Sequence, residues 1–192
     1  MTASGKHSPR AARIGVTSEA SDERELVERT MRGDEAAFAA LYHRHVSAAY
    51  TAAHRLLRNA ADAEDVAQEL FLALPKTLLG YDPARGPLGP WLRRVAVRLA
   101  LIRMRSVRRR RETDAGSVAT LLARDDAALE RLSIETALAR LSEDQRTVFL
   151  LKEVEGYEHR EIAALLDISV ANSEIRLFRA RQALRALLGG TR

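Results

Sequence analysis

The sequence predicts an all-α protein made of two small helical domains joined by a flexible linker, with a helix-turn-helix in the C-terminal domain. Of the 192 residues, 46% are hydrophobic but only 5% are aromatic. Alanine, leucine and arginine dominate and favour helices, whereas the valine and isoleucine that favour strands are sparse. Apolar residues recur at three- and four-residue steps, the spacing of one face of a helix. A chain of this length can form two small cores.

The composition restricts which binding sites, cellular compartment and partners this protein can have. There is no cysteine, which excludes a disulfide framework and a cysteine-ligated zinc site. No apolar segment approaches the roughly 20 residues that span a bilayer, so we expect a cytoplasmic protein without membrane insertion. The net charge is +5, and all but three of the 31 basic residues are arginine. Arginine favours contacts with phosphates and base edges, which makes nucleic acid the first partner to consider.

The N-terminal third combines a tail with two helices. Residues 1–21 show no periodicity, and we expect a disordered tail there. A short helix is predicted from residue 22 until Gly33 ends it, and Asp34 can cap the next helix. That next helix carries an amphipathic stripe about 20 residues long. The stripe consists of Phe38, Leu41, Tyr42, Val46, Ala49, Ala53 and Leu56.

Two further helices complete the predicted N-terminal domain, residues 22–111. A third helix is expected from Asp62 to about Leu79, with Pro75 as a kink or break. Segment 80–90 holds three prolines and three glycines, which forbid a continuing helix. A fourth helix then runs from Trp91 through the arginines at 108–111. The predicted inward residues are Val66, Ala67, Leu70, Phe71 and Leu74 in the third helix, and Trp91, Val95, Leu99 and Ile102 in the fourth.

The C-terminal domain, residues 127–192, is predicted to follow a linker over residues 112–126, where the apolar pattern is lost. Four helices are expected in this domain, with breaks near residues 141–142, Gly156 and 167–169. Ser142 is followed three residues later by Gln145, which is a capping-box signature for the start of a helix.

The end of the chain has the parts of a helix-turn-helix: a helix over 158–166, a tight turn over 167–169 and a longer basic helix over 170–188. In this motif the second helix enters the major groove of DNA. Leu177, Ala180 and Leu184 share one ridge of that helix, and the residues away from the ridge are candidates for base and phosphate contacts. These candidates are Asn172, Glu174, Ile175, Arg176 and Arg179. The alternative is an ordinary helical hairpin with a solvated basic face.

The fourth helix is a second candidate for nucleic-acid contact. Nine arginines and no acidic residue lie between Trp91 and Arg111, enough to follow a nucleic-acid backbone with a steep salt dependence. Arg94, Arg98 and Arg105 lie beside the predicted inward stripe. An exposed Trp91 could stack on an unpaired base. Alternatively, Trp91 is a core residue and the arginines are only solvated.

The third helix carries an acidic stripe in an otherwise basic protein. Asp62, Asp65 and Glu69 are spaced i, i+3 and i+7 and therefore share one face, with Glu64 and Gln68 alongside. Carboxylates in a first turn are stabilised by the helix dipole, so capping is the simpler explanation for the first of them. That explanation does not cover Glu69. The stripe is therefore a candidate docking face for a basic protein partner.

No motif for catalysis is present in the sequence. His43 and His45 do not have the four-residue spacing of a metal-binding helix face, and there is no HExxH. Phosphate-binding loops, dinucleotide fingerprints and nucleophile elbows are also missing. We therefore expect no enzymatic activity, no cofactor and no metal.

Six segments carry a resemblance to a known family. Residues 33–42 (GDEAAFAALY), 62–71 (DAEDVAQELF) and 91–96 (WLRRVA) closely resemble the first domain of sigma-70 family RNA polymerase sigma factors, specifically the extracytoplasmic-function (ECF) group. Residues 141–146 (LSEDQR), 161–163 (EIA) and 176–181 (RLFRAR) look like that family's second domain. The resemblance spans roughly residues 22–111 and 127–188, in the family's order.

The resemblance implies a sigma factor, which binds core RNA polymerase and directs promoter-specific initiation while the polymerase performs the chemistry. The acidic stripe would dock on the β′ subunit, through Asp62, Glu64, Asp65, Gln68, Glu69 and Phe71. The fourth helix and the preceding loop would recognise the minus-10 element, through Trp91, Arg94, Arg98 and Arg105. The helix-turn-helix would read the minus-35 element. Expected partners are core polymerase, through its β′ and β subunits, promoter DNA and an anti-sigma factor, and the free chain is expected to be a monomer.

Several positions depart from the family's usual residues. Arg98 stands where asparagine is usual, and Ile102 where aspartate is common. Ser173 replaces the usual buried valine near the start of the last helix, which would weaken packing unless its hydroxyl finds a backbone partner. Glu174 can accept a hydrogen bond from cytosine N4, and Ile175 can contact a thymine methyl group. We therefore predict a minus-35 sequence unlike the group's usual one.

Two other functions remain open on the sequence. A helix-turn-helix transcriptional regulator, acting without replacing a sigma subunit, would bind DNA without polymerase, usually as a dimer at a palindromic site. A helical adaptor or anti-factor would show no salt-dependent affinity for DNA. The acidic stripe with Gln68 favours the sigma factor, because neither alternative needs a docking face there.

Overall fold

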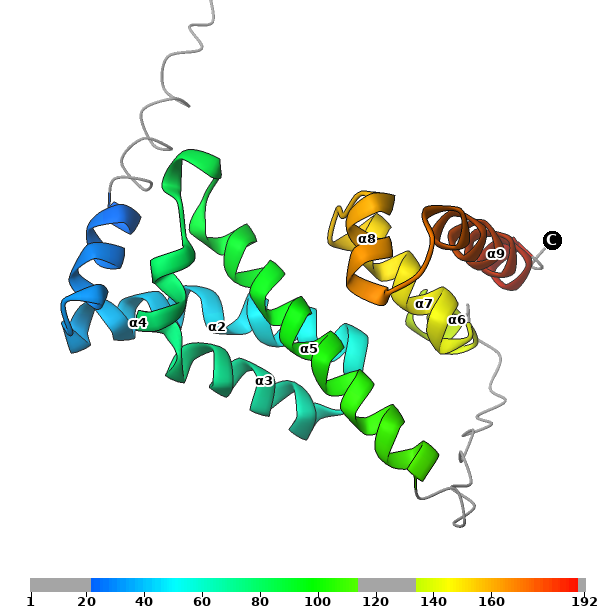
Figure 1. Ribbon diagram of the computed structural model, residues 1–192, viewed down its shortest axis with the longest axis horizontal. Coiled ribbons are helices and arrows are strands. Elements are labelled where there is room, and N and C mark those ends of the chain that lie inside the picture. Colours follow the sequence, from blue (N-terminus) through cyan, green and yellow to red (C-terminus); the bar gives the residue numbers. More distant parts are fainter. Residues whose placement is uncertain (1–21, 114–133, 190–192) are drawn as a thin grey trace, which may run out of the picture. The chain divides into compact units, whose positions relative to one another are not determined.

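The computed structural model describes residues 22–113 and 134–189, and within these ranges every regular element is a helix (Figure 1). The all-α prediction is therefore confirmed. The predicted tail and all but the first two residues of the predicted linker lie outside the described residues. The chain divides into two compact units within its longest described helix, after Val97, with residues 55–58 assigned to the second unit. The domain boundaries expected at residues 111 and 127 remain predictions.

The N-terminal unit begins with a helix over residues 22–31 and a tight turn, followed by α2, Glu35–Leu57. Gly33 occupies the turn with a φ of +88°, a conformation that glycine adopts without steric cost. Asp34 caps α2, because its Oδ1 accepts a hydrogen bond from the Ala37 N–H at 3.0 Å and its Oδ2 accepts one from Arg29 at 2.8 Å. These bonds, the backbone bond above all, lower the pKa of Asp34. The predicted helix end and cap are confirmed.

The buried face of α2 is shifted around the helix relative to the predicted stripe. Its buried residues are Ala37, Leu41, His45, Ala49, Ala52, Ala53 and Leu56. Three predicted inward residues, Phe38, Tyr42 and Val46, lie at the rim of this face. From this rim Tyr42 packs against the next helix in the chain, because its ring contacts the Phe71 ring edge-on, with 5.0 Å between the ring centroids. Small residues take the centre of the face because they let a neighbouring helix come close.

The third helix, α3, runs from Ala60 to Leu72. It begins before the predicted Asp62 because Asn59 is the cap, its Oδ1 accepting a hydrogen bond from the Asp62 N–H at 3.1 Å. It ends before the predicted Leu79, and a second short helix, α4, follows over Leu74–Thr77 with Pro75 in its first turn. Proline is tolerated there because a first-turn N–H has no partner within the helix. The predicted inward residues of α3 and α4 are all buried.

Two 3₁₀ turns lead to the longest helix. These are η1, Leu78–Gly80, and η2, Pro83–Arg85, and α5 then runs from Leu88 to Thr113. It starts before the predicted Trp91 because Pro90 lies within its first turn. Proline is tolerated there, since the N–H groups of a first turn have no acceptor within the helix. It also continues two residues into the segment predicted as linker.

The predicted inward stripe of α5 is wrong. The buried residues are Leu88, Leu92, Ala96, Val97, Ala100 and Leu101. Trp91, Val95 and Leu99 are half-buried at the rim, and Ile102 is exposed. Both sets have helical spacing, so periodicity could not separate them. The alanine-containing set faces inward because small side chains permit close approach of helices.

The C-terminal unit contains the four predicted helices with their predicted breaks. They are α6, Ile134–Ala139; α7, Glu143–Phe149, continued by the π-helical turn η3, Leu150–Val154; α8, His159–Leu166; and α9, Val170–Gly189. Ser142 caps α7, its Oγ accepting a hydrogen bond from the Gln145 N–H at 3.3 Å. Residues of α6 and α9 share a buried cluster with Leu141, and α7 and α8 both pack on α9.

Candidate protein and nucleic-acid interfaces

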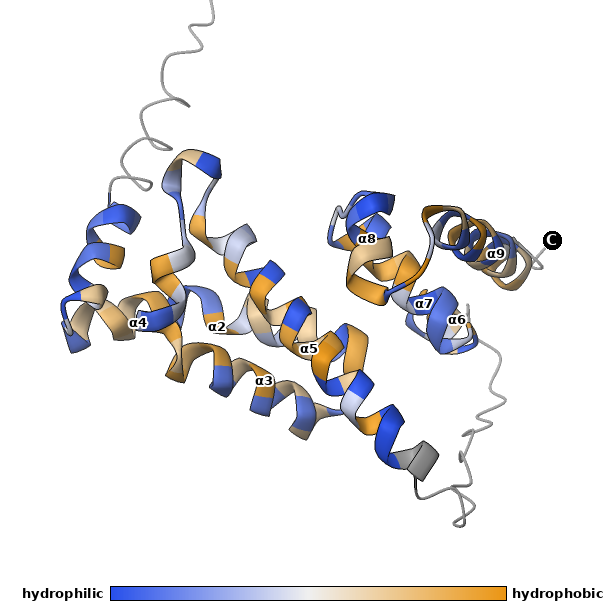
Figure 2. Ribbon diagram, viewed as in Figure 1, coloured by the Kyte–Doolittle hydropathy of each residue, from blue (hydrophilic) through white to orange (hydrophobic). Residues whose placement is uncertain are grey.

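The acidic stripe lies on the exposed face of α3. Glu64, Asp65, Gln68 and Glu69 are exposed, and Asp62 next to the Asn59 cap is partly covered. Figure 2 shows polar and apolar residues alternating along this helix, as expected for a helix with one face in a core and one in solvent. Capping therefore does not account for the stripe, because only Asp62 lies in the first turn and the other four polar residues lie beyond it. We call Glu64, Asp65, Gln68 and Glu69 the acidic surface.

Phe71 requires a correction. The family resemblance placed it among the contacts with polymerase, but Phe71 is only 2% exposed and packs against Tyr42. Phe71 therefore holds α3 against α2 from the inside and does not belong to the acidic surface.

Leu72 is a surface residue that the sequence analysis missed. It is 76% exposed at the end of α3, three residues after Glu69 and seven after Asp65. That spacing places it on the same face as these carboxylates. The period of the acidic residues was the signal that could have found it. The acidic surface thus ends in an exposed apolar side chain.

The loop before α5 is held by an aromatic pair. The Tyr81 and Trp91 rings lie 5.3 Å apart, and the Tyr81 hydroxyl donates a hydrogen bond to the Gly86 carbonyl at 3.0 Å. Burial raises the pKa of Tyr81 still further above neutral pH, where a phenol is already protonated and able to donate. Trp91 is half-buried. It is therefore neither a fully buried core residue nor a freely exposed stacking platform.

Glu23, which the sequence analysis did not single out, connects three helices of the N-terminal unit. Its Oε1 lies 2.9 Å from His45 Nε2, and its Oε2 accepts a hydrogen bond from the Leu88 N–H at 3.3 Å. The His45 ring lies against the first turn of α5, where a Cβ on Gly89 would come within 3.4 Å of it. No sequence spacing links these residues. The start of α5 is thus anchored by a carboxylate from the first helix.

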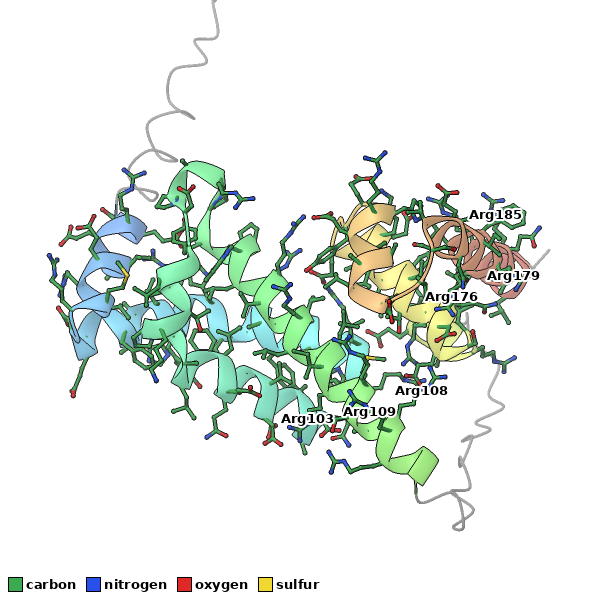
Figure 3. All side chains as sticks on the ribbon, viewed as in Figure 1. Arg103, Arg108, Arg109, Arg176, Arg179 and Arg185 are labelled. Atoms are coloured by element: carbon green, nitrogen blue, oxygen red, sulfur yellow. The ribbon has the colours of Figure 1, made fainter. Side chains whose placement is uncertain are left out.

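The arginines of α5 are distributed over its accessible surface. Arg94, Arg98 and Arg105 are all exposed, as are Arg108 and Arg109. Figure 3 shows Arg103, Arg108 and Arg109 projecting from the last turns of this helix. The described side chains of α5 from Trp91 onward include no carboxylate. Between Trp91 and Arg110 the charged side chains of this long helix are therefore all arginines.

The predicted helix-turn-helix is present as α8, a turn and α9. Asp167 ends α8 with a φ of +55°, a left-handed conformation that aspartate tolerates better than most residues. Ser169 starts α9, since its Oγ accepts a hydrogen bond from the Asn172 N–H at 3.1 Å. Leu177, Ala180 and Leu184 are buried along one ridge of α9, as predicted.

The candidate reading residues of α9 have different environments. Glu174, Ile175 and Arg179 are exposed and Asn172 is half-buried. Arg176 is tied to α7, because its guanidinium lies 2.9 Å from an Asp144 carboxylate oxygen. Arg176, Arg179 and Arg185 all project from α9 in Figure 3. Phe178, which was not among the predicted site residues, is 60% exposed on the same helix as these arginines.

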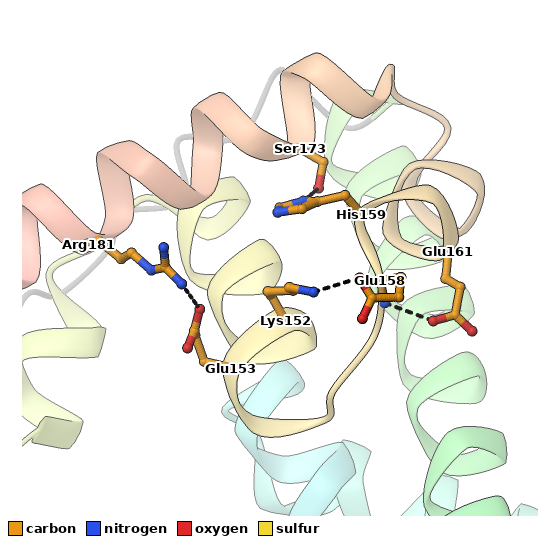
Figure 4. A network of polar contacts seen from close by, with 7 residues as sticks. All are labelled: Lys152, Glu153, Glu158, His159, Glu161, Ser173 and Arg181. Atoms are coloured by element: carbon orange, nitrogen blue, oxygen red, sulfur yellow. Dashed lines mark hydrogen bonds and ion pairs between the residues drawn. The ribbon is translucent and has the colours of Figure 1, made fainter.

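Polar contacts join α9 to the elements on which it packs (Figure 4). Arg181 pairs with Glu153 of η3, and Ser173 Oγ lies 2.9 Å from His159 Nδ1 of α8. The buried serine hydroxyl thus has a partner, which is a side chain and not the backbone group named as the condition for keeping the packing. A further pair, Lys152 with Glu158 at 2.9 Å, joins η3 to the residue before α8, and its hydrogen bond lowers the pKa of Glu158.

Two negative findings apply to the described part of the chain. Among residues 22–113 and 134–189, no group of three or more histidine, aspartate or glutamate side chains is placed to hold a metal ion. Within the same ranges, no helix combines the length and apolar character needed to cross a bilayer.

Sequence models of two protein regions match this chain. The model described as Sigma-70 region 2 matches residues 41–111, and the model described as Sigma-70, region 4 matches residues 131–184. The first range contains the acidic surface and most of α5, and the second contains the helix-turn-helix. Neither a stand-alone regulator nor a helical adaptor accounts for both matches in this order.

Individual sigma factors are similar to this chain over most of their length. The RNA polymerase sigma factor CarQ of Myxococcus xanthus is 33% identical over 168 residues, which cover 85% of this chain and 95% of CarQ. The ECF RNA polymerase sigma factor SigW of Bacillus subtilis is 29% identical over 177 residues, covering 84% of this chain and 94% of SigW.

Solved structures give the same result. CnrH, solved in complex with the cytosolic domain of CnrY, matches with a TM-score of 0.51 and 31% identity, over 89% of this chain and 99% of CnrH. RpoE of Bartonella quintana, solved with the anti-sigma factor NepR, matches with a TM-score of 0.52 and 25% identity, over 77% of this chain and 93% of RpoE. The chain therefore belongs to the sigma-70 family of RNA polymerase sigma factors, in its ECF group, and directs promoter-specific transcription initiation.

Proposed function

We propose that the acidic surface of α3, together with Leu72, is the contact through which this sigma factor binds the β′ subunit of core RNA polymerase. The observation that carries this proposal is the exposure of Asp65, Gln68 and Glu69 on one face of a helix whose opposite face is buried. Carboxylates attract a basic partner surface, and the neighbouring Leu72 adds apolar area that gains by being covered. Asp62 and Glu64 lie at the edge of the same contact.

The proposed minus-10 contacts are Trp91, Arg94, Arg98 and Arg105 of α5. The exposed guanidinium groups suit a phosphate backbone, and the half-buried Trp91 leaves part of its ring for a base. Glu23 and the Tyr81–Trp91 pair support this role by fixing the start of α5 and the loop before it.

The proposed minus-35 contacts are Asn172, Glu174, Ile175 and Arg179, with Arg176 held beside them by Asp144. They lie on the first half of α9, the part of a recognition helix that reaches base edges. Glu174 and Ile175 suit cytosine N4 and a thymine methyl group, which supports a minus-35 sequence unlike the group's usual one.

Further parts of the proposal concern partners and location. Because RpoE of Bartonella quintana was solved with an anti-sigma factor, we include an anti-sigma factor among the partners of this chain. The free chain is proposed to be a monomer, acting in the cytoplasm where polymerase works. Polymerase supplies the phosphoryl-transfer chemistry, so the chain needs no catalytic group, cofactor or metal of its own.

Transcription in vitro tests the docking surface. The purified chain is added to sigma-free core polymerase on genomic fragments, beside an Asp65→Arg, Glu69→Arg variant. We expect defined transcripts with the parent and at least a hundredfold loss with the variant, because reversal of two charges converts attraction into repulsion. Retention of core polymerase on the immobilised chain should fall in parallel.

A matched control makes the result specific. Glu25→Arg, Glu28→Arg reverses two exposed charges on the helix over residues 22–31, outside the proposed contact. This control should transcribe like the parent, and all three proteins should unfold at similar temperatures. If the docking variant transcribes as well as the control, the acidic surface is not the polymerase contact.

A further inference from the structure

Ser173 occupies an unusual place in the recognition helix. It is the fourth residue of α9, between the proposed reading residues Asn172 and Glu174, and its side chain is fully buried. Serine at such a place contributes little apolar area, while its hydroxyl must find a partner or remain unpaired at a cost in stability. The position therefore needs a specific second residue.

That residue is His159, the first residue of α8. Its Nδ1 lies 2.9 Å from Ser173 Oγ, and the histidine itself is half-buried (Figure 4). The Ser173 hydroxyl is accordingly not among the buried side-chain atoms that lack a hydrogen-bond partner. One directional bond thus joins the two helices of the helix-turn-helix at the end of α9 that carries the reading residues.

The other polar contacts of α9 are less suited to set its orientation. Arg176 pairs with Asp144 and Arg181 with Glu153, but both pairs are partly solvated. Exposed ion pairs hold their geometry weakly, because solvent screens the charges and long side chains adjust. The apolar ridge around Leu177 and Ala180 is buried but has no directional preference. The Ser173 bond is directional, and its serine end is fully buried.

We propose that His159 and Ser173 form a positioning pair that sets the orientation of α9, and thereby the base preference of Asn172, Glu174 and Ile175. The inference rests on the proposed reading of the minus-35 element by α9. Ser173 is fully buried, so the pair acts through the position of α9 and not through a contact of this serine with DNA. Its loss changes which bases are preferred, because small rotations of α9 redirect the side chains on either side of Ser173.

Selection from a random library tests the pair. The full chain is assembled with core polymerase and presented with promoters whose minus-35 segment is randomised and whose minus-10 segment is constant. Ser173→Ala and His159→Phe each remove the bond, whereas His159→Asn places an amide atom where Nδ1 was. Lys152→Ala is the matched control, since it breaks the exposed pair with Glu158 in the same domain but leaves α9 untouched.

We expect the parent, His159→Asn and Lys152→Ala to select one motif. Ser173→Ala and His159→Phe should lose discrimination at one or more positions by about fivefold or more, the size of one good base contact. The double variant Ser173→Ala, His159→Phe should resemble either single variant. The ¹⁵N shifts of the His159 ring should change in Ser173→Ala, which shows that the bond exists in solution.

Each contrary outcome has a distinct meaning. If Ser173→Ala and His159→Phe select the parent's motif with only a lower yield, the pair is merely structural and the inference is overturned, while the proposed reading by α9 stands. If the parent itself selects no motif in the randomised segment, the proposed minus-35 reading fails and the inference fails with it. Thermal unfolding identifies a variant that does not fold. If either Ser173→Ala or His159→Phe fails to fold, the motif selected by the other variant tests the pair.

Discussion

Glu23 of the first helix and His45 of α2 are in contact, with 2.9 Å between Oε1 of the carboxylate and Nε2 of the imidazole, although 22 residues separate them in the chain. Two effects act on the histidine in opposite directions. Burial lowers the pKa of His45, and the nearby carboxylate raises it, but burial is the larger effect. The imidazole is therefore neutral at neutral pH, and the contact is a hydrogen bond rather than an ion pair.

We predict that the free energy of unfolding of the N-terminal unit decreases as the pH falls below about 6.5, the ordinary pKa of histidine. In that range the unfolded chain binds a proton that the buried imidazole does not, which favours unfolding. The slope from this residue is at most about 1.4 kcal/mol per pH unit. Denaturant unfolding between pH 5 and 8 should show this pH dependence of the free energy of unfolding in the parent, and the dependence should be absent in His45→Gln. His43→Gln, at an exposed position, should keep the parent's slope; equal slopes for both variants would refute the assignment.

Adjacent residues at the end of α3 should separate stability from polymerase binding. Phe71→Ala removes a buried ring that packs against Tyr42 and is expected to cost about 3–5 kcal/mol. Leu72→Ala shortens an exposed side chain, so its effect on unfolding should stay within about 0.5 kcal/mol. Affinity for core polymerase should nevertheless fall in Leu72→Ala. Thermal unfolding and a polymerase-binding titration on both variants provide the check, and unchanged affinity in Leu72→Ala would remove this residue from the contact.

The arginines of α5 should act through counterion release. Arg98→Ala and Arg105→Ala are each expected to reduce the slope of log affinity against log salt by about 0.7 on single-stranded minus-10 DNA. Arg24→Ala, at an exposed position on the first helix, should leave the slope unchanged. The measurement is a salt series of binding titrations with polymerase holoenzyme. An equal slope in all four proteins would show that α5 does not follow the phosphates.

Two arginines one helical turn apart on α9 should behave differently. Arg179 is exposed, so Arg179→Ala should weaken binding to the minus-35 element with little change in stability. Arg176 is held by Asp144, and its replacement should weaken DNA binding less than that of Arg179. A double-mutant cycle on Arg176 and Asp144 should give about 0.2–1 kcal/mol for the pair. The reverse order of DNA affinities would make Arg176 the principal reader.

Local signals in the sequence were sufficient for some elements and not for others. The cap at Asp34, the break near Gly156 and the turn at residues 167–169 depend on residues within a few positions of each other, and the structure has them as predicted. The buried stripe of α5 was predicted wrongly, because two apolar stripes fit a helical period equally well and only the neighbouring helices select between them. Periodicity predicted Phe71 to face inward, and the structure confirms this. Its place among the polymerase contacts came from the family resemblance, which does not determine which face a residue occupies.

The sequence by itself determined the class and order of the helices, the acidic residues on one face of α3 and the basic helix-turn-helix at the end of the chain. These properties depend on residue spacing and composition within one continuous segment of the chain. Only the tertiary structure decided that Glu23 anchors the start of α5, which stripe of α5 is buried and that Ser173 is paired with His159. Such contacts join segments far apart in the sequence or depend on which face a neighbour covers. They arise only when packing brings the helices together.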